Sequence, residues 1–565
     1  MDEKILIREY LSSLKEDTEL DKIFVFLLES MGFEIISTPV ESKGQSQYGK
    51  DIVAIGLAEN GKKHSWYFEL KGGDDANIDA NKFNKPDGIR ESLLEAKDVT
   101  YRFLETKGFE KLPTKFVLVH NGVLKENFKD QFNGFIKKTF SEGEFEHWDI
   151  NKLTPLFYEK LFNEYLFTTE IRRNNLKRIL IFLSLPDYDF NHLHILINDV
   201  LHEFVSNQKL GKRKVSLLFY SIGVLLRLIW SYSKEQGNHY HVKYAINYCI
   251  LNTWQSILIT KKTNNKAVLG LFSKLLNIQY EFYGNYFVNS FELARLKNGI
   301  ASQIGSTFES IAFPLKTYQY LDDLVYYFTL KNQIDGFRNL TENQNIQKDL
   351  IHEIFNSNEG GGHKIILDSQ LIQIHHIFKF MLNSKQLRLS DVNFLLKFIG
   401  IIIDQIYLRK LRKNSFPYNS KNLEQLIEFE ATGFKGDTYP EGESQLIAML
   451  YEYFAIFNQT AIFEDLTEFT KEVDLQIAEP LWEEIPDFEQ RYFGGYLSEE
   501  YCIDLIDNPT DFNEFRSNVK TKYVQKDNFI TNKIYPFLTT LAQSFYQNEP
   551  DPNEWRDWFR KIKIE

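Results

Sequence analysis

The pattern of apolar positions divides the chain into a first part that mixes strand and helix signals and a longer part with mainly helical signals. Apolar runs over residues 33–36, 53–55, 66–70, 116–119 and 145–150 predict five strands. Helical stripes precede the first run, lie between the third and fourth runs and follow the last run. The run at 116–119 is uninterrupted, which is typical of a buried strand in a parallel sheet. Residues 1–169 are therefore predicted to form an α/β domain.

Beyond residue 170, helical stripes follow one another with short polar connections, and strand patterns nearly vanish. This pattern predicts a large all-α bundle or an irregular helical solenoid without a repeat of fixed period. Polar and turn residues near 416–440 predict a further boundary, and the glycines at 360–362 predict a flexible joint. We therefore expect a multidomain protein with a helical domain over 170–415 and a C-terminal helical subdomain over 416–565.

Composition narrows the class of protein. The chain has 565 residues, of which 43% are hydrophobic and 25% charged, so it is predicted to be globular with more than one core. Cys249 and Cys502 lack the spacing of a zinc site, and the charged start of the chain does not resemble a secretory signal. We expect a cytoplasmic protein. The apolar stretch at 215–226 is interrupted by Arg227, which favours a buried helix over membrane contact.

Candidate chemistry lies on the second and third predicted strands. Side chains alternate along a strand, so Glu69 and Lys71 share one face. A turn at Asn60-Gly61 would pair the two strands and bring Asp51 beside Glu69. Two carboxylates and one ammonium on one face suit a hard divalent cation and the charge that develops on a phosphate. Asp51 and Glu69 are therefore the candidate metal ligands, and Lys71 is the candidate for positioning water.

These residues occur as Gly49-Lys50-Asp51-Ile52 and Glu69-Leu70-Lys71, a pattern that resembles the PD-(D/E)xK nuclease superfamily and, within it, the Mrr-type restriction endonuclease domain. The predicted element order, α-β-β-β-α-β, agrees with the order that the resemblance implies. The resemblance also implies an acid on the upstream helix, for which Asp21 is the best match and Glu19 a substitute. It implies a catalytic set of Asp51, Glu69, Lys71 and Asp21 with Mg²⁺ or Mn²⁺ as cofactor.

The expected function is therefore that of a metal-dependent endonuclease that cleaves DNA, with double-stranded DNA as the expected substrate. Fusion of such a domain to a helical sensor or interaction domain resembles bacterial anti-phage defence effectors. An activating partner protein, a nucleic-acid trigger or homo-oligomerisation would then control it. The alternative is a non-catalytic scaffold that keeps the nuclease fold and binds nucleic acid or a protein. The sequence leaves open the choice between DNA and RNA, the sequence specificity, the trigger, the oligomeric state and any operon partner.

Basic residues are the candidates for nucleic-acid contact, because phosphate contacts supply most sequence-independent affinity. The net charge of −12 argues against a protein that coats nucleic acid in general, but it does not exclude an enzyme with its basic residues on one face. Each basic cluster is also typical of a solvated helix end, so the sequence does not decide which one contacts nucleic acid. The clusters are Arg172, Arg173, Lys177 and Arg178; Lys209, Lys212, Arg213 and Lys214; and Arg409, Lys410, Arg412 and Lys413.

Overall fold

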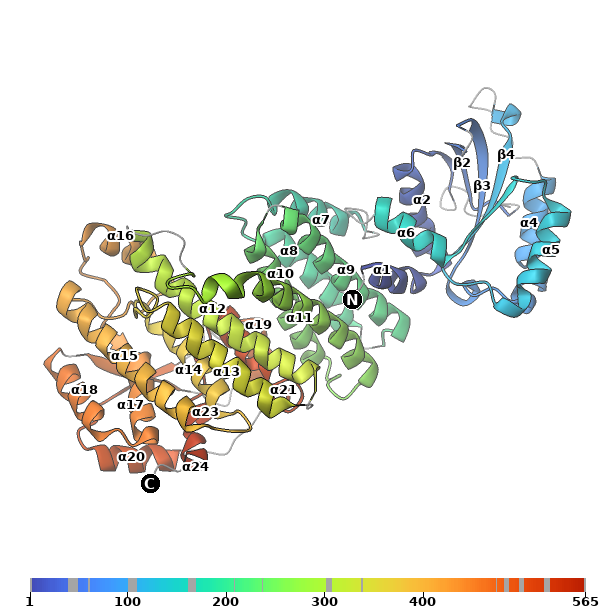
Figure 1. The fold of residues 1–565 in the computed structure, drawn as a ribbon. Helices are drawn as coiled ribbons and strands as arrows, with labels where there is room; N and C mark the ends of the chain where they lie inside the picture. The colour runs from blue at the N-terminus through green and yellow to red at the C-terminus, as the bar shows by residue number, and fades with distance from the viewer. Residues whose placement is uncertain are drawn as a thin grey trace. The chain divides into compact units, whose positions relative to one another are not determined.

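The chain packs as two compact units, Met1–Gln279 and Tyr280–Glu565 (Figure 1). The predicted boundary at 169/170 lies inside the first unit, and the boundary at 415/416 lies inside the second. The computed structural model describes residues 3–38, 49–58, 61–99, 109–160, 169–207, 209–235, 237–300, 307–336, 339–473, 475–481, 487–496, 502–522 and 529–562.

A mixed sheet with the strand order β1-β2-β3-β4-β5 organises the start of the first unit. The first three strands pair antiparallel, whereas β3, β4 and β5 pair parallel. The five strands predicted from the apolar runs are confirmed. They are β1 (Glu34–Ser37), β2 (Ile52–Leu57), β3 (Lys63–Lys71), β4 (Thr114–His120) and β5 (Phe145–Trp148).

Helices surround this sheet and then continue without further strands to the end of the described part of the first unit. A π-helical turn, Glu16–Leu20, lies between the first two helices. Asn60, residues 100–108 and residues 161–168, on which parts of the predicted turn and helices fall, lie outside the described residues. The helices are α1 (Glu3–Ser12), α2 (Asp21–Ser30), α3 (Ala80–Asn84), α4 (Ile89–Asp98), α5 (Lys129–Thr139), α6 (Ile150–Lys160), α7 (Glu170–Phe182), α8 (Asn191–Ser206), α9 (Lys212–Glu235), α10 (His239–Ile259) and α11 (Lys266–Ala294), which extends past the boundary between the units.

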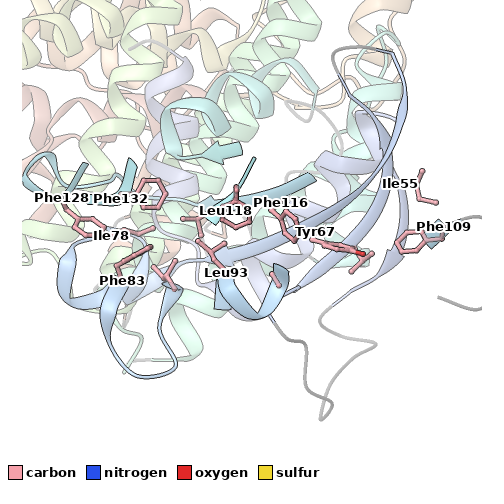
Figure 2. Packing of buried hydrophobic residues seen from close by; sticks show 14 residues of the cluster. Ile55, Tyr67, Ile78, Phe83, Leu93, Phe109, Phe116, Leu118, Phe128 and Phe132 are labelled. Carbon is pink, nitrogen blue, oxygen red and sulfur yellow. The ribbon is translucent and has the colours of Figure 1, made fainter. Parts of the chain in front are cut away.

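Each face of the sheet is covered by an aromatic core. On one face, Phe68 of β3 packs edge-on against Phe24 of α2, with ring centroids 5.3 Å apart. On the other face, Tyr67 and Leu118 belong to a cluster that includes Phe83 of α3 and buried residues of α4 and α5 (Figure 2). Burial of these side chains provides the main driving force for the layered arrangement. Glu69 and Lys71 follow Tyr67 at intervals of two residues, so they share its face of the sheet, at the end of β3.

The second unit is mostly helical, but its C-terminal part also contains strands, so the prediction of an all-α structure is wrong there. A three-stranded sheet with the order β6-β7-β8 is present there. Its strands are β6 (Glu443–Ser444), β7 (Gln476–Leu481) and β8 (Cys502–Ile506), which are short and come from distant segments, so local periodicity does not reveal them. The helices are α12 (Thr307–Ile334), α13 (Leu340–Ser357), α14 (Leu371–Leu382), α15 (Leu389–Lys413), α16 (Glu424–Thr432), α17 (Gln445–Phe457), α18 (Thr460–Glu472), α19 (Phe488–Gly494), α20 (Phe512–Lys522), α21 (Ile530–Ile534), α22 (Phe537–Tyr546), α23 (Asn553–Arg556) and α24 (Trp558–Lys561).

Two other sequence predictions have a clear structural outcome. Residues Lys214–Lys234 of α9 are long and apolar enough to cross a membrane, and 67% of their most apolar window is buried inside the protein, as expected for a core helix. The predicted flexible joint at residues 360–362 is instead a turn inside the second unit, where Gly361 and Gly362 are buried. A Cβ at Gly362 would lie 2.5 Å from the Thr317 hydroxyl, so glycine permits this close packing.

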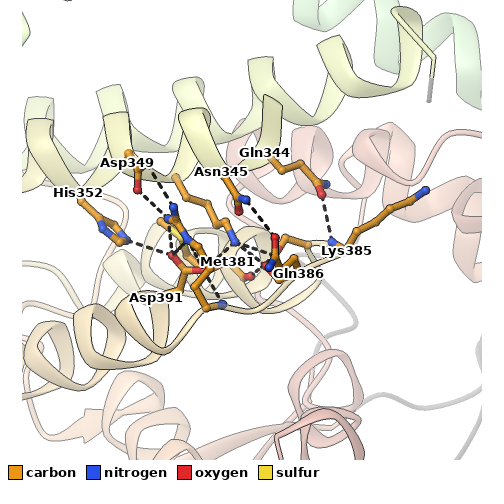
Figure 3. Close-up of polar contacts among 11 residues, drawn as sticks. Gln344, Asn345, Asp349, His352, Met381, Lys385, Gln386 and Asp391 are labelled. Carbon is orange, nitrogen blue, oxygen red and sulfur yellow. Dashed lines mark hydrogen bonds and ion pairs between the residues drawn. The ribbon is translucent and has the colours of Figure 1, made fainter. Parts of the chain in front are cut away.

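A buried ion pair ties α13 to α15 in the second unit. The Lys348 and Asp391 side chains are both 0% exposed, and Lys348 Nζ lies 2.7 Å from Asp391 Oδ2. Lys348 also donates to Gln386 O, and Asp391 pairs with Arg388 as well (Figure 3). Because two charges have been removed from water here, each depends on its hydrogen-bonding partners.

We predict that Asp391→Ala lowers the free energy of unfolding of the second unit by about 3–5 kcal/mol, because it leaves the Lys348 ammonium buried without a carboxylate. Lys348→Met should cost less, since Asp391 keeps Arg388 as a partner. Hydrogen exchange of peptides from α13 and α15 measures both effects. Asp335→Ala, which breaks the exposed pair with Lys331 on α12, is the control and should cost under about 1 kcal/mol. Equal costs for Asp391→Ala and Asp335→Ala would contradict the role of this ion pair.

Candidate active site

The pairing of β2 with β3 brings Asp51 next to Glu69. Ile52 lies opposite Phe68 in the antiparallel register, so Asp51, one residue earlier, reaches the level of Glu69. Asp51 Oδ2 accepts a hydrogen bond of 2.7 Å from the backbone N–H of Leu70. Glu69 is 3% exposed, and its carboxylate therefore depends on nearby donors. The two candidate metal ligands thus meet on one face of the sheet.

The Lys71 ammonium is surrounded by oxygen atoms. Its Nζ lies 2.9 Å from Glu69 Oε1 and 3.2 Å from Glu16 Oε1, and it donates a 2.8 Å hydrogen bond to Leu70 O. An ammonium has three hydrogens, so these three acceptors match its donors. The side chain is therefore held in one place at the end of β3.

Glu16 is the acid that the sequence prediction missed. It opens the π-helical turn Glu16–Leu20, and besides Lys71 it contacts the backbone N–H of Gly72, which donates to Glu16 Oε2 over 3.1 Å. A Cβ at Gly72 would lie 2.7 Å from the Glu16 backbone nitrogen, so glycine at this position lets the turn approach β3. A π-helical turn does not follow the α-helical period of 3.6 residues, so a search for that period does not detect it. Single π-helical turns are frequent at functional sites.

The two upstream acids proposed from the sequence, Glu19 and Asp21, lie in and directly after the same π-helical turn. Glu19 Oε2 accepts a 2.9 Å hydrogen bond from the backbone N–H of Lys15, so it stabilises the start of the π-helical turn. Asp21 begins α2 and is 7% exposed. Glu16 of this segment contacts Lys71, and a catalytic role for Asp21 stays a prediction.

Charge and burial together define the electrostatics of the cluster. Burial raises the pKa of the Asp51 carboxyl to about 8, and the negative charge of Glu69 adds to this rise, while Lys71 opposes it. Burial also raises the pKa of Glu16 against the opposing effect of Lys71. Burial by itself lowers the pKa of Lys71, but Glu69, Asp51 and Glu16 outweigh burial and raise it above its ordinary value. Lys71 thus stays charged at neutral pH, and three carboxyl groups share one cation.

The donor set fits a small divalent cation. Mg²⁺ prefers oxygen ligands and usually takes one or two carboxylates together with waters and substrate phosphate oxygens. Asp51 and Glu69 provide such a pair, and a cation between them would relieve the repulsion that raises the pKa of Asp51. Across the part of the chain that the structure describes, no group of three Asp, Glu, His or Cys side chains is arranged to hold a metal alone. Water and substrate oxygens would therefore complete the coordination.

The basic clusters proposed to contact nucleic acid are partly neutralised by acids. Arg172 and Lys214, from the first and second clusters, both pair with Glu203, at 3.1 and 2.9 Å. In the third cluster, Arg409 is 8% exposed and lies 2.9 Å from Glu430. Lys413, also in the third cluster, pairs with Glu430 as well. These four cations have protein partners, and phosphate contact by the clusters stays a prediction.

Comparison with known proteins assigns no function to the chain, so a function is argued from the residues of the site. No family model, no curated protein and no solved structure matches the chain.

The backbone before Asp51 generates a testable prediction. Gly49 has φ +66° and a Cβ there would lie 1.9 Å from Ser92 O, whereas Gly61 has φ +72° and open space around it. Gly61→Ala should therefore cost only the left-handed strain of about 1–2 kcal/mol. Gly49→Ala should cost more, because the Cβ must also displace α4 or the segment that carries Asp51. Thermal unfolding and hydrogen exchange of β2 and β3 measure the difference, and equal losses would contradict this account of how Asp51 is positioned.

Proposed function

We propose that the protein is a metal-dependent endonuclease that hydrolyses phosphodiester bonds in DNA, with double-stranded DNA as substrate. The observation that supports this most strongly is the convergence of Asp51, Glu69 and Glu16 around Lys71 at the ends of neighbouring strands. Two carboxylates can hold a metal ion there, and the ammonium held beside them carries the charge that a phosphate requires. A merely structural ion pair needs one acid for Lys71, whereas this site has three carboxyl groups.

The fold around these residues also supports the proposal. The order of α2, β1, β2, β3, α4 and β4 agrees with the order that the PD-(D/E)xK resemblance implies. Glu16 would fill the place of the upstream acid in that pattern. We assign the site to this class on the combination of residues, spacing and strand order.

Each residue of the site has a chemical role in this proposal. Asp51 and Glu69 would hold Mg²⁺ or Mn²⁺, which when bound supplies charge neutralisation at the phosphate and lowers the pKa of water. When Glu69 turns to the metal, it would release one N–H of Lys71, and Lys71 Nζ would then orient the attacking water and stabilise negative charge on the phosphate oxygens. Glu16 holds Lys71 by its carboxylate and thus fixes the direction of the ammonium. The N–H of Leu70 fixes the orientation of Asp51.

The alternative is a scaffold that binds nucleic acid or a protein without catalysis. The saturation of the Lys71 ammonium by Glu69, Glu16 and Leu70 O would be sufficient for such a structural role. The two functions differ in metal dependence. Cleavage that starts with Mg²⁺ and stops with a chelator supports the enzyme, whereas metal-independent binding without cleavage supports the scaffold.

We predict that Lys71→Met lowers the rate of plasmid cleavage in Mg²⁺ by at least about 100-fold, because it removes charge stabilisation that develops in the transition state. Asp51→Ala and Glu69→Ala should have a comparable effect through loss of metal ligands. Lys63→Met, at the exposed start of the same strand, is the matched control and should cleave normally. The assay uses supercoiled plasmid and RNA in parallel. Wild-type cleavage by a correctly folded Lys71→Met protein would rule out the proposed site.

A second prediction separates the two candidate upstream acids. Glu16→Gln keeps the size of the side chain but weakens its hold on Lys71, so cleavage should fall by about tenfold or more. Asp21→Asn should reduce cleavage less, since the contact to Lys71 comes from Glu16. Single-turnover rates measure both variants after circular dichroism has verified their folds. A larger loss for Asp21→Asn than for Glu16→Gln would assign the upstream acid to Asp21 instead.

We further propose that the helical part of the first unit regulates the site through α1. Helix α1 packs against α9 as well as α6. Lys274 of α11 pairs with Glu9 of α1 and lies 3.2 Å from the Tyr220 hydroxyl of α9. Because only residues 13–15 separate α1 from the π-helical turn with Glu16, a shift of α1 would move an acid that holds Lys71. An activator that binds the helices could use this route.

This arrangement predicts that Lys274→Met raises the cleavage rate of the full-length protein several-fold, because it weakens a contact that restrains α1. Lys266→Met, at an exposed position of the same helix, serves as the control. Both variants are compared on one plasmid, with and without candidate activators. If Lys274→Met and Lys266→Met cleave at the same rate in every condition, α1 does not transmit regulation.

A further inference from the structure

Asn121, the first residue after β4, contacts the two segments that meet at the Lys71 ammonium. The parallel register of β3 and β4 sets His120 opposite Lys71, so Asn121 comes one residue beyond the level of Lys71. Its backbone N–H donates to Lys71 O over 3.4 Å. Its side chain is 0% exposed and contacts the segment that precedes Glu16. One buried residue thus connects the strand that carries Lys71 with the segment that carries Glu16.

The side-chain amide of Asn121 closes the C-terminal end of α1. Its Nδ2 donates to Leu11 O over 2.7 Å and to Leu14 O over 2.8 Å, which uses both hydrogens of the amide. Carbonyl groups at the end of a helix lack partners within the helix, and here a side chain from the sheet satisfies them. Only Lys15 separates Leu14 from Glu16, so these two hydrogen bonds determine where the π-helical turn begins.

The oxygen of the same amide indicates that stability alone does not explain this residue. Asn121 Oδ1 is buried and has no hydrogen-bond partner in the part of the chain that the structure describes. A buried acceptor without a partner costs free energy, but a flipped amide would set this oxygen against the two carbonyl oxygens of α1. The amide is therefore held in one orientation by the end of α1. Such unpaired buried groups often reflect a functional constraint.

Glu16 passes this constraint to the candidate site. Its Oε1 lies 3.2 Å from Lys71 Nζ, and its Oε2 accepts from the backbone N–H of Gly72 over 3.1 Å. Leu11 and Leu14 are almost completely buried, so the segment before Glu16 is also held by apolar contacts. A displacement of the end of α1 would therefore move the Glu16 carboxylate away from the ammonium.

We propose that Asn121 is a positioning residue of the candidate active site: it fixes the end of α1 and thereby holds the Glu16 carboxylate on the Lys71 ammonium. Its part in cleavage rests on the nuclease function proposed above, whereas its effect on Lys71 does not. Asn121 fixes α1 to the sheet, whereas Lys274 fixes α1 to the helices. The two contacts thus act on Glu16 in opposite senses.

The first test is a double-mutant cycle on single-turnover cleavage of plasmid by the full-length protein with Mg²⁺. Asn121→Ala should lower the rate at saturating plasmid by about tenfold and leave plasmid affinity unchanged, because Asn121 acts through Lys71 and not on DNA. In the Glu16→Gln protein the same substitution should change the rate by less than about twofold, since the connection is already broken. Equal losses in both backgrounds would overturn the proposed role.

The control for this cycle is another buried asparagine of the first unit. The Asn175 side chain donates to Ile171 O of its own helix, α7, and makes no contact with α1 or the sheet. Asn175→Ala should therefore cleave like the wild type even if it lowers the unfolding temperature. Asn121→Asp keeps the size of the side chain and lacks both N–H donors, so it replaces Asn121→Ala if that variant does not fold.

A second measurement needs no cleavage. Acetylation of Lys71 by an N-hydroxysuccinimide ester, followed by mass spectrometry, should be several-fold faster in Asn121→Ala than in the wild type, because the ammonium is released from Glu16. Hydrogen exchange of Glu16–Leu20 should be faster as well, and Asn175→Ala should match the wild type in both. Unchanged acetylation and exchange would overturn the positioning role even in a protein that cleaves DNA. Faster acetylation and exchange in a protein that never cleaves would support it and refute the nuclease function instead.

Discussion

The contact of the Lys71 ammonium with Glu69 and Glu16 is the interaction on which the candidate site depends. It joins the end of β3 to the π-helical turn that follows α1, two segments 55 residues apart in the chain. Because the ammonium is largely removed from water, its charge must be matched by carboxylates, and their excess in turn favours a cation. The same balance between the Lys71 ammonium and the surrounding carboxyl groups thus holds the site together and supports metal binding there.

The same region connects the site to the rest of the first unit. Asn121, which directly follows β4, donates from Nδ2 to Leu11 O and Leu14 O at the end of α1, over 2.7 and 2.8 Å. Helix α1 packs against α9 on one side, and its end is held at the sheet by Asn121. The position of Glu16 therefore depends on the sheet and on the helices together. This shared dependence is the physical basis for the proposed regulation.

Local patterns in the sequence were sufficient to predict the strands of the first sheet and part of the candidate site. Strand alternation predicted that Glu69 and Lys71 share a face, and antiparallel pairing with β2 placed Asp51 beside them. Glu16 could not be predicted in this way, because a π-helical turn changes the helical count and its partner Lys71 is distant in sequence. The small sheet β6–β8 and the buried Lys348–Asp391 pair also arise from contacts between distant segments. Periodicity detects which face is buried, but not which distant group completes a polar site.

The most direct test of the central claim is a crystal structure of the full-length protein grown with Mn²⁺ and measured at the manganese absorption edge. The account predicts one anomalous peak bound by the carboxylates of Asp51 and Glu69, with Lys71 Nζ beside it and still in contact with Glu16. Oxygen ligands from these two side chains at about 2.0–2.3 Å would be typical of a small divalent cation. Absence of manganese from these carboxylates at saturating Mn²⁺, with Lys71 unchanged between Glu69 and Glu16, would contradict the account and favour a structural ion cluster.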